Sequence, residues 1–130
     1  MLNYYRNLES ARGIRKLLKR LYTGRCDPRL LVVAGTEHPE LVRGLMEKRC
    51  PFCSLTVRRR YVLLNHMSGG RCSLMTALVL REILERYRLA NSCIRYAPGY
   101  RRYVVRYGEH LDSFATFEEA YRFLRRVAGW

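Results

Sequence analysis

The sequence predicts an α+β protein in which helices come first and a small antiparallel sheet comes near the end. Apolar residues recur every three or four positions in several segments before residue 91, as on one face of an amphipathic helix. Beyond that point apolar and polar residues alternate, which is typical of strands. We therefore expect a basic helical region over residues 1–47, a cysteine-rich segment over 48–72, a long helix over 73–90, and a three-stranded sheet with a helix over 91–130.

Length and composition favour a single folded unit. The chain has 130 residues, of which 48% are hydrophobic, so it can bury a core of its own. No repeat or low-complexity linker interrupts it, and we expect residues 1–130 to form one compact unit. The longest apolar run, residues 30–34, is far too short to span a bilayer, and the N-terminus lacks the pattern of a signal peptide. We expect an intracellular protein without a membrane partner.

Residues 8–22 predict a basic amphipathic helix. The apolar positions of one face are Leu8, Ala11, Ile14, Leu17, Leu18 and Leu21. The cationic positions of the other face are Arg12, Arg15, Lys16, Lys19 and Arg20. The cationic face either contacts phosphates or another anionic surface, or is the solvated side of a helix that packs on the core.

Three further elements are expected before the sheet. Residues 30–34 (LLVVA) have the length and apolar character of a short buried strand. Pro39 suits the first turn of a helix, which then runs on to Cys50. Ser73 is a suitable cap for the long helix, and Asn91 is a suitable end.

The sheet and the last helix follow. Three alternating segments, CIRYA, RRYVVRY and HLDSF, are separated by turn residues at 98–99 and 108–109. Thr116 and Glu119 form a capping box, and an apolar stripe follows at helical spacing. We expect this stripe to pack on the sheet.

The cysteine-rich segment has the spacing Cys-x2-Cys-x12-His-x5-Cys. The four candidate ligands are Cys50, Cys53, His66 and Cys72. Two thiolates from one tight turn, with a histidine and a fourth ligand from a helix end, suit a single tetrahedral Zn²⁺. Four protein ligands leave no position for water, so the zinc would be structural. The alternatives are a disulfide between Cys50 and Cys53, or a reduced pair with an unrelated histidine. Cys26 and Cys93 are either buried apolar residues or, in a hyperthermophile, a disulfide.

This segment resembles the C2H2-type zinc-finger family, as a C2HC variant over residues 50–72. The apolar Val57 and Leu63 stand at the family's core spacing between the ligands. The segment departs from the family at Val57, where an aromatic residue is usual, at Cys72, which replaces a histidine, and at residues 68–70 (SGG), which break the helix. The resemblance implies base-reading positions at Arg59, Val62 and Asn65.

The charge of the chain favours a polyanionic partner. Formal net charge is +14, and 22 of the 25 cationic residues are arginine, whose guanidinium grips phosphate in a bidentate fork. A GC-rich genome or a hot habitat is the alternative origin of this bias. Residues 48–72 contain six cationic residues and no acidic one: Lys48, Arg49, Arg58, Arg59, Arg60 and Arg71.

The helix of the finger is apolar on nearly every side, because four consecutive residues of it, 61–64 (YVLL), are apolar or aromatic. A free finger needs only one narrow apolar face. We therefore prefer a zinc knuckle that is embedded in a larger core and presents Arg58, Arg59 and Arg60 at its edge. The alternative is a free finger in which Arg59 reads a guanine edge and Asn65 reads an adenine edge.

The predicted sheet offers a second basic surface. Alternation places Arg95, Arg102 and Arg106 on the face opposite the tyrosines. The pattern resembles the three-stranded sheet plus helix of plant AP2-type and integrase-arm DNA-binding modules, which implies contact with the major groove. The alternative is an ordinary solvated face.

The sequence offers little for catalysis. Acidic residues are scattered, His110 and Asp112 simply alternate on one strand, and nucleotide-binding loops and nucleophile motifs are missing. We expect a zinc-containing nucleic-acid-binding protein, DNA rather than RNA, acting as a small transcriptional regulator and not as an enzyme. The alternative is a zinc-stabilised interaction protein that meets an acidic partner or forms a homodimer. RNA would be favoured if tyrosines lie exposed beside arginines. The Arg-rich, Gln-free chain also resembles small zinc-finger proteins of viruses of hyperthermophilic archaea, such as the Pyrobaculum spherical virus.

Overall fold

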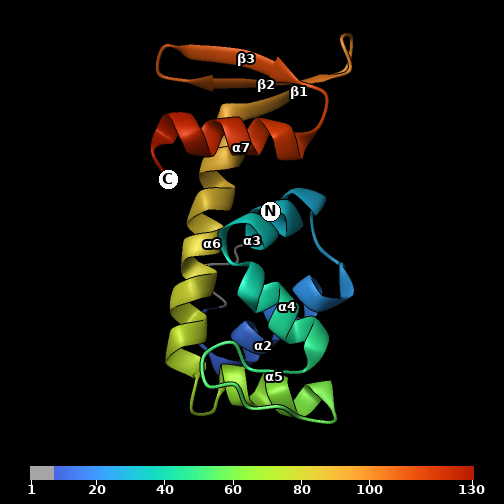
Figure 1. Cartoon of the computed structure of the whole chain (residues 1–130), viewed down its shortest axis with the longest axis vertical. Coiled ribbons are helices and arrows are strands. Elements are labelled where there is room, and N and C mark those ends of the chain that lie inside the picture. Colours follow the sequence, from blue (N-terminus) through green and yellow to red (C-terminus); the bar gives the residue numbers. More distant parts are fainter. Residues whose placement is uncertain (1–7) are drawn as a thin grey trace. The chain divides into compact units, whose positions relative to one another are not determined.

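The computed structural model describes residues 8–130, so the first seven residues of the predicted region 1–47 lie outside it. Six helices and one three-stranded antiparallel sheet lie in this described part of the chain, which confirms the α+β class (Figure 1). The chain divides into two units, Met1–Leu84 and Glu85–Trp130. The single compact unit expected from the sequence stays a prediction. Within residues 8–130, none of the helices has the length and apolar character needed to cross a membrane.

The first helix of unit 1 is α2 (Ala11–Thr23), which confirms the basic amphipathic helix. The Ser10 hydroxyl accepts a hydrogen bond from the Gly13 backbone N–H at 3.0 Å and so caps the first turn. The helix ends at Gly24, whose φ of +73° suits a residue without a side chain. The apolar face of α2 is buried from Ile14 to Leu21, Ala11 is exposed, and the basic face is largely exposed.

The prediction of a strand over residues 30–34 is wrong, because these residues lie inside α3 (Pro28–Glu37). Asp27 caps this helix by accepting the backbone N–H of Arg29 at 3.0 Å, and Pro28 occupies its first position. Leu30, Val33 and Ala34 are buried together, at a spacing that helix geometry places on one face. A short apolar run fits a buried strand and a buried helix equally well, so the start signal at residues 27–28 decides.

The next helix, α4 (Pro39–Glu47), begins at the proline as predicted. Lys48 ends it in the left-handed conformation, with φ of +56°, and turns the chain toward the cysteines. Gly44 allows the chain to return close to the helix, because an added Cβ would lie only 2.5 Å from the Arg49 carbonyl oxygen. These two residues set the position of the cysteine-rich segment.

Two helices follow the first cysteine pair. The short α5 (Arg60–Ser68) packs against α2 and buries Leu63, Leu64 and Met67. The long α6 (Ser73–Cys93) belongs to unit 1 up to Leu84 and to unit 2 from Glu85. It continues past the predicted end at Asn91, and it buries Leu80, Ile83 and Leu84.

Unit 2 contains the sheet and the last helix. The strands β1 (Ile94–Ala97), β2 (Arg102–Tyr107) and β3 (His110–Phe114) pair antiparallel in the order β1-β2-β3. In this register Ile94 faces Val105, and Tyr103 faces both Tyr96 and Phe114.

The last helix, α7 (Phe117–Ala128), covers one face of the sheet (Figure 1). Thr116 caps it through the predicted box, since its hydroxyl accepts the Glu119 backbone N–H at 3.1 Å. The ring of Phe117 lies 5.9 Å from that of Tyr103, centroid to centroid. Tyr121 and Leu124 are fully buried. The predicted packing of the apolar helical stripe on the sheet is confirmed.

Candidate metal centre and basic surfaces

Cys50 and Cys53 lie on one tight turn after α4. Arg49 pairs with Thr56 in an isolated antiparallel bridge, and the Cys50 backbone N–H donates to the Leu55 carbonyl at 2.8 Å. Ser54, in the left-handed conformation, donates its N–H to the Cys50 carbonyl at 2.9 Å and closes the turn. The turn therefore directs the Cys50 and Cys53 thiols to the same side.

The other two predicted ligands, His66 and Cys72, come from helix ends. His66 lies in the last turns of α5, and Cys72 directly precedes α6. Between them the chain passes so close to α5 that a Cβ on Gly70 would lie 2.9 Å from the His66 carbonyl oxygen. Gly70, in the segment that breaks the finger helix, thus allows the close approach that brings Cys72 toward His66.

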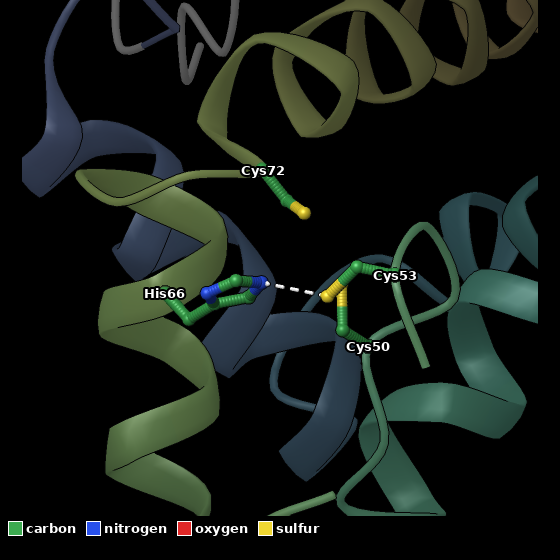
Figure 2. A group of neighbouring side chains, drawn as sticks. All are labelled: Cys50, Cys53, His66 and Cys72. Atoms are coloured by element: carbon green, nitrogen blue, oxygen red, sulfur yellow. Dashed lines mark hydrogen bonds between the residues drawn. The ribbon is translucent and has the colours of Figure 1, made fainter. Parts of the chain in front are cut away.

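The side chains of Cys50, Cys53, His66 and Cys72 point toward one centre (Figure 2). Their ligand atoms all lie within 4.8 Å of one another, and the Cys53 Sγ lies 3.2 Å from the His66 Nε2. A tetrahedron with metal–sulfur bonds of ~2.3 Å has edges of ~3.8 Å, so the donors need only small shifts around an ion, and Cys53 and His66 would move slightly apart. The predicted set is confirmed as one cluster that could hold a single metal ion.

The thiols of the cluster differ in acidity. Burial raises the pKa of the Cys72 thiol to about 12, and hydrogen bonds with Cys53 and Cys50 act in the same direction. A hydrogen bond from the Leu55 backbone N–H lowers the pKa of Cys53. At neutral pH the metal-free cluster therefore keeps a proton on Cys72, and a bound dication would displace it because metal ligands are thiolates.

A basic groove lies between α2 and α5. It has a volume of about 530 Å³ and is lined by Arg12, Arg15, Lys16, Lys19, Tyr22, Arg60, Tyr61, Leu64 and Asn65. Five of these nine residues are cationic and, within the described part of the chain, none is acidic. We call this feature the α2–α5 groove.

Two predicted nucleic-acid contacts have protein partners in this groove. Arg60 donates from Nε to the Leu45 carbonyl at 2.9 Å and from Nη2 to the Met46 carbonyl at 3.3 Å, and its guanidinium lies 3.8 Å above the Tyr22 ring. Asn65 accepts a hydrogen bond at 3.2 Å from Arg15 of α2. Arg60 therefore joins three helices, and Asn65 lies on the side of α5 that faces α2.

The remaining predicted contacts of this region are exposed. Arg58 and Arg59 precede α5, where Arg59 occupies the cap position without a side-chain cap bond. Arg71 lies next to Cys72, and its charge helps to lower the pKa of Cys53. Its role as a nucleic-acid contact stays a prediction.

In unit 2 the strand register places Arg95, Arg102 and Arg106 on the sheet face opposite α7. Arg102 is fixed by hydrogen bonds to the hydroxyl and carbonyl of Ser113, at 2.8 and 2.9 Å. Arg95 and Arg106 line a shallow hollow of about 460 Å³ together with Val104 and Leu111. The face combines cations with apolar side chains, and its contact with nucleic acid stays a prediction.

Sequence reasoning missed three parts of this arrangement. The sequence predicts the basic stripe of α2, but nothing local indicates that this stripe forms a wall opposite α5. The apolar run 61–64 predicts that Tyr61 packs against protein, whereas this residue is 61% exposed. Tyr22 carried no signal of its partnership with Arg60. Cys26 and Cys93 are each half-buried, and they belong to different units, so a disulfide between them stays a prediction.

Comparison with known proteins adds no relative. The resemblances to the C2H2-type finger family and to archaeal viral proteins therefore stay predictions. No protein-family model, curated protein or solved structure matches this chain.

Proposed function

We propose that this protein is a zinc-stabilised nucleic-acid-binding protein that serves as a small DNA-binding transcriptional regulator and not as an enzyme. Cys50, Cys53, His66 and Cys72 would hold one Zn²⁺, since three soft thiolates and one imidazole suit this ion. The ion would supply no chemistry beyond joining the turn after α4 to α5 and α6. It thereby supports one wall of the α2–α5 groove.

The α2–α5 groove is the observation that carries the proposal. Arg12, Arg15, Lys16 and Lys19 repeat along α2 at intervals of three and four, so they form one stripe on the helix surface. All four are exposed. Like charges held this close repel one another unless a counter-charge binds, and no acidic residue lines the groove in the described part of the chain. A row of phosphates is the counter-charge that such a stripe fits.

The test is the salt dependence of binding. Binding of a fluorescent oligonucleotide should weaken about a hundredfold between ~50 and ~200 mM salt if about four phosphates are neutralised. The double variant Lys16→Ala/Lys19→Ala should reduce the slope of log affinity against log salt by about 2. Arg43→Ala removes an exposed charge of α4 that does not line the groove, and should leave the slope unchanged. An affinity that barely responds to salt would sink the proposal.

A second candidate function rests on a different surface. On the first turns of α6 three large apolar side chains are exposed: Leu74, Met75 and Leu78. Such a patch on a helix favours a protein partner or a second copy of the chain. Size-exclusion chromatography at several protein concentrations separates the two candidates. A homodimer formed through this patch would dissociate on dilution, and the double variant Leu74→Lys/Leu78→Lys would be a monomer at every concentration.

A further inference from the structure

The two tyrosines of the α2–α5 groove differ in what covers them. The Tyr22 ring is half-buried and already carries the guanidinium of Arg60 on its face, at 3.8 Å from the ring centroid. Tyr61, in the first turn of α5, is 61% exposed and lines the same groove. The groove therefore presents one aromatic surface to solvent, beside a row of cations.

The two walls of the groove offer different chemistry. The α2 wall carries the exposed cations Arg12, Lys16 and Lys19. The α5 wall carries Tyr61, with the buried Leu64 at its base. A ligand that contacts both walls of the groove needs a polyanionic edge and a flat apolar edge. A nucleotide strand has this composition, with phosphates on one side and bases on the other.

Pairing decides which form of nucleic acid fits. In a duplex the faces of the bases are stacked inside and only their edges reach the grooves, whereas in a single strand a base can leave the stack and lie on an aromatic ring. The exposed ring of Tyr61 is thus useful to an unpaired strand and of little use to a duplex.

Insertion of α5 into a major groove is also hindered by its neighbour. The groove of B-DNA is about 12 Å wide and admits one helix, whose diameter with side chains is about 10–12 Å. Asn65, one of the positions that would read a base edge, is hydrogen-bonded to Arg15 of α2 at 3.2 Å. At Asn65 the base-reading side of α5 therefore faces α2, and at this position the two helices together are too wide to enter.

We infer that the α2–α5 groove binds an unpaired nucleic-acid strand, with a base stacked on Tyr61 and the adjoining phosphates against Arg12, Lys16 and Lys19. This inference rests on the proposed function and specifies the form of nucleic acid that the groove takes. The amide group of Asn65, held in place by Arg15, adds a hydrogen-bonding group beside the stacked base.

The test compares one oligonucleotide in two forms. Fluorescence anisotropy measures binding of a mixed-sequence strand of about 12 nucleotides, single or annealed to its complement, at one salt concentration. The single strand, as DNA or as RNA, should bind about tenfold more tightly than the duplex. Tyr61→Leu keeps an apolar side chain but removes the ring, and should weaken single-strand binding about tenfold while duplex binding changes less than twofold. Tyr61→Phe should bind like the wild type.

A matched control comes from unit 2. Tyr100 is 83% exposed and lies outside the groove, so Tyr100→Leu should leave both affinities unchanged. Thermal unfolding of each variant checks the fold, and substitution of an exposed side chain should move it little. Equal binding of both forms, or equal losses in Tyr61→Leu and Tyr100→Leu, would overturn the inference and leave the proposed function intact. Failure of the wild type to bind either form would instead remove the proposed function.

Discussion

The guanidinium of Arg60 lies 3.8 Å above the ring of Tyr22 while its Nε donates to the carbonyl of Leu45 at 2.9 Å. One side chain at the start of α5 therefore holds the end of α2 and the last turn of α4. The carbonyl groups at the end of a helix lack partners within it, and a cation is favourable there. Arg60 thus acts within the fold of unit 1, although the sequence pointed to a nucleic-acid contact.

Removing this side chain should cost stability. We expect Arg60→Ala to lower the free energy of unfolding by about 2 kcal/mol, from the loss of a cation–π contact and two hydrogen bonds to carbonyls. Urea unfolding of the metal-loaded protein measures the change. Arg59→Ala is the control, because Arg59 is the preceding residue, is exposed and makes no side-chain cap bond. Equal effects of the two substitutions would show that Arg60 contributes no more than a surface charge.

The cysteine cluster predicts one bound metal ion per chain. Elemental analysis of the purified protein should find about one equivalent of zinc. Cys50→Ser and Cys72→Ser should both lose the ion and much of the folded structure of unit 1, because a structural zinc ion contributes its binding energy to folding. Cys26→Ser keeps all four ligands and should keep the ion. Full metal content in Cys72→Ser would exclude Cys72 as a ligand.

Metal binding should depend on pH in a defined direction. Burial raises the pKa of Cys72 to about 12, so in the metal-free protein this thiol is protonated at neutral pH and must lose its proton when the ion binds. Affinity should therefore rise as pH rises, about tenfold per pH unit for each proton released. Competition with a chelator of known pH dependence at about pH 6, 7 and 8 measures this slope. An affinity independent of pH would mean that no thiol proton is displaced.

The cluster could be predicted from the sequence because its spacing is local. A turn fixes Cys50 and Cys53 within four residues, and one short helix fixes the distance from there to His66. Helix ends with a cap are similarly local, as at Thr116. Residues 30–34 show the limit of such reasoning. Five consecutive apolar residues fit a buried strand as well as a buried helix, and the cap at Asp27 is the local feature that favours the helix.

The α2–α5 groove could not be predicted, for a different reason. Its walls lie about fifty positions apart in the chain, and the hydrogen bond between Arg15 and Asn65 spans this separation. The sequence shows which residues of a helix are cationic, but the partner that the helix faces is set by tertiary packing. For the same reason the sequence predicts that Tyr61 packs, although the buried face of α5 is filled by Leu63 and Met67.

His38 directly precedes α4, and its ring lies between two carboxylates. Its Nδ1 lies 2.7 Å from Glu40 and its Nε2 lies 2.7 Å from Glu82 of α6. A neutral imidazole carries one N–H, so both carboxylates are hydrogen-bonded only when the ring is protonated. Partial burial by itself would lower the pKa of His38, but the hydrogen bonds to Glu40 and Glu82 and their charges raise it.

A raised pKa fixes the sign of the effect on stability. The contribution of His38 is complete below the unfolded pKa of about 6.5 and disappears as pH rises through the folded value. His38→Gln should therefore lower the free energy of unfolding by about 1 kcal/mol near pH 6, and by less near pH 9, the modest size following from the half-exposed carboxylates. Urea unfolding of variant and wild type at each pH measures the difference in their free energies of unfolding. Because both proteins share the other titrating groups, the effects of those groups largely cancel in this difference. Glu82→Gln should reduce the same pH dependence, and a loss in His38→Gln that is equal at both pH values would mean that the ring does not change its protonation between them.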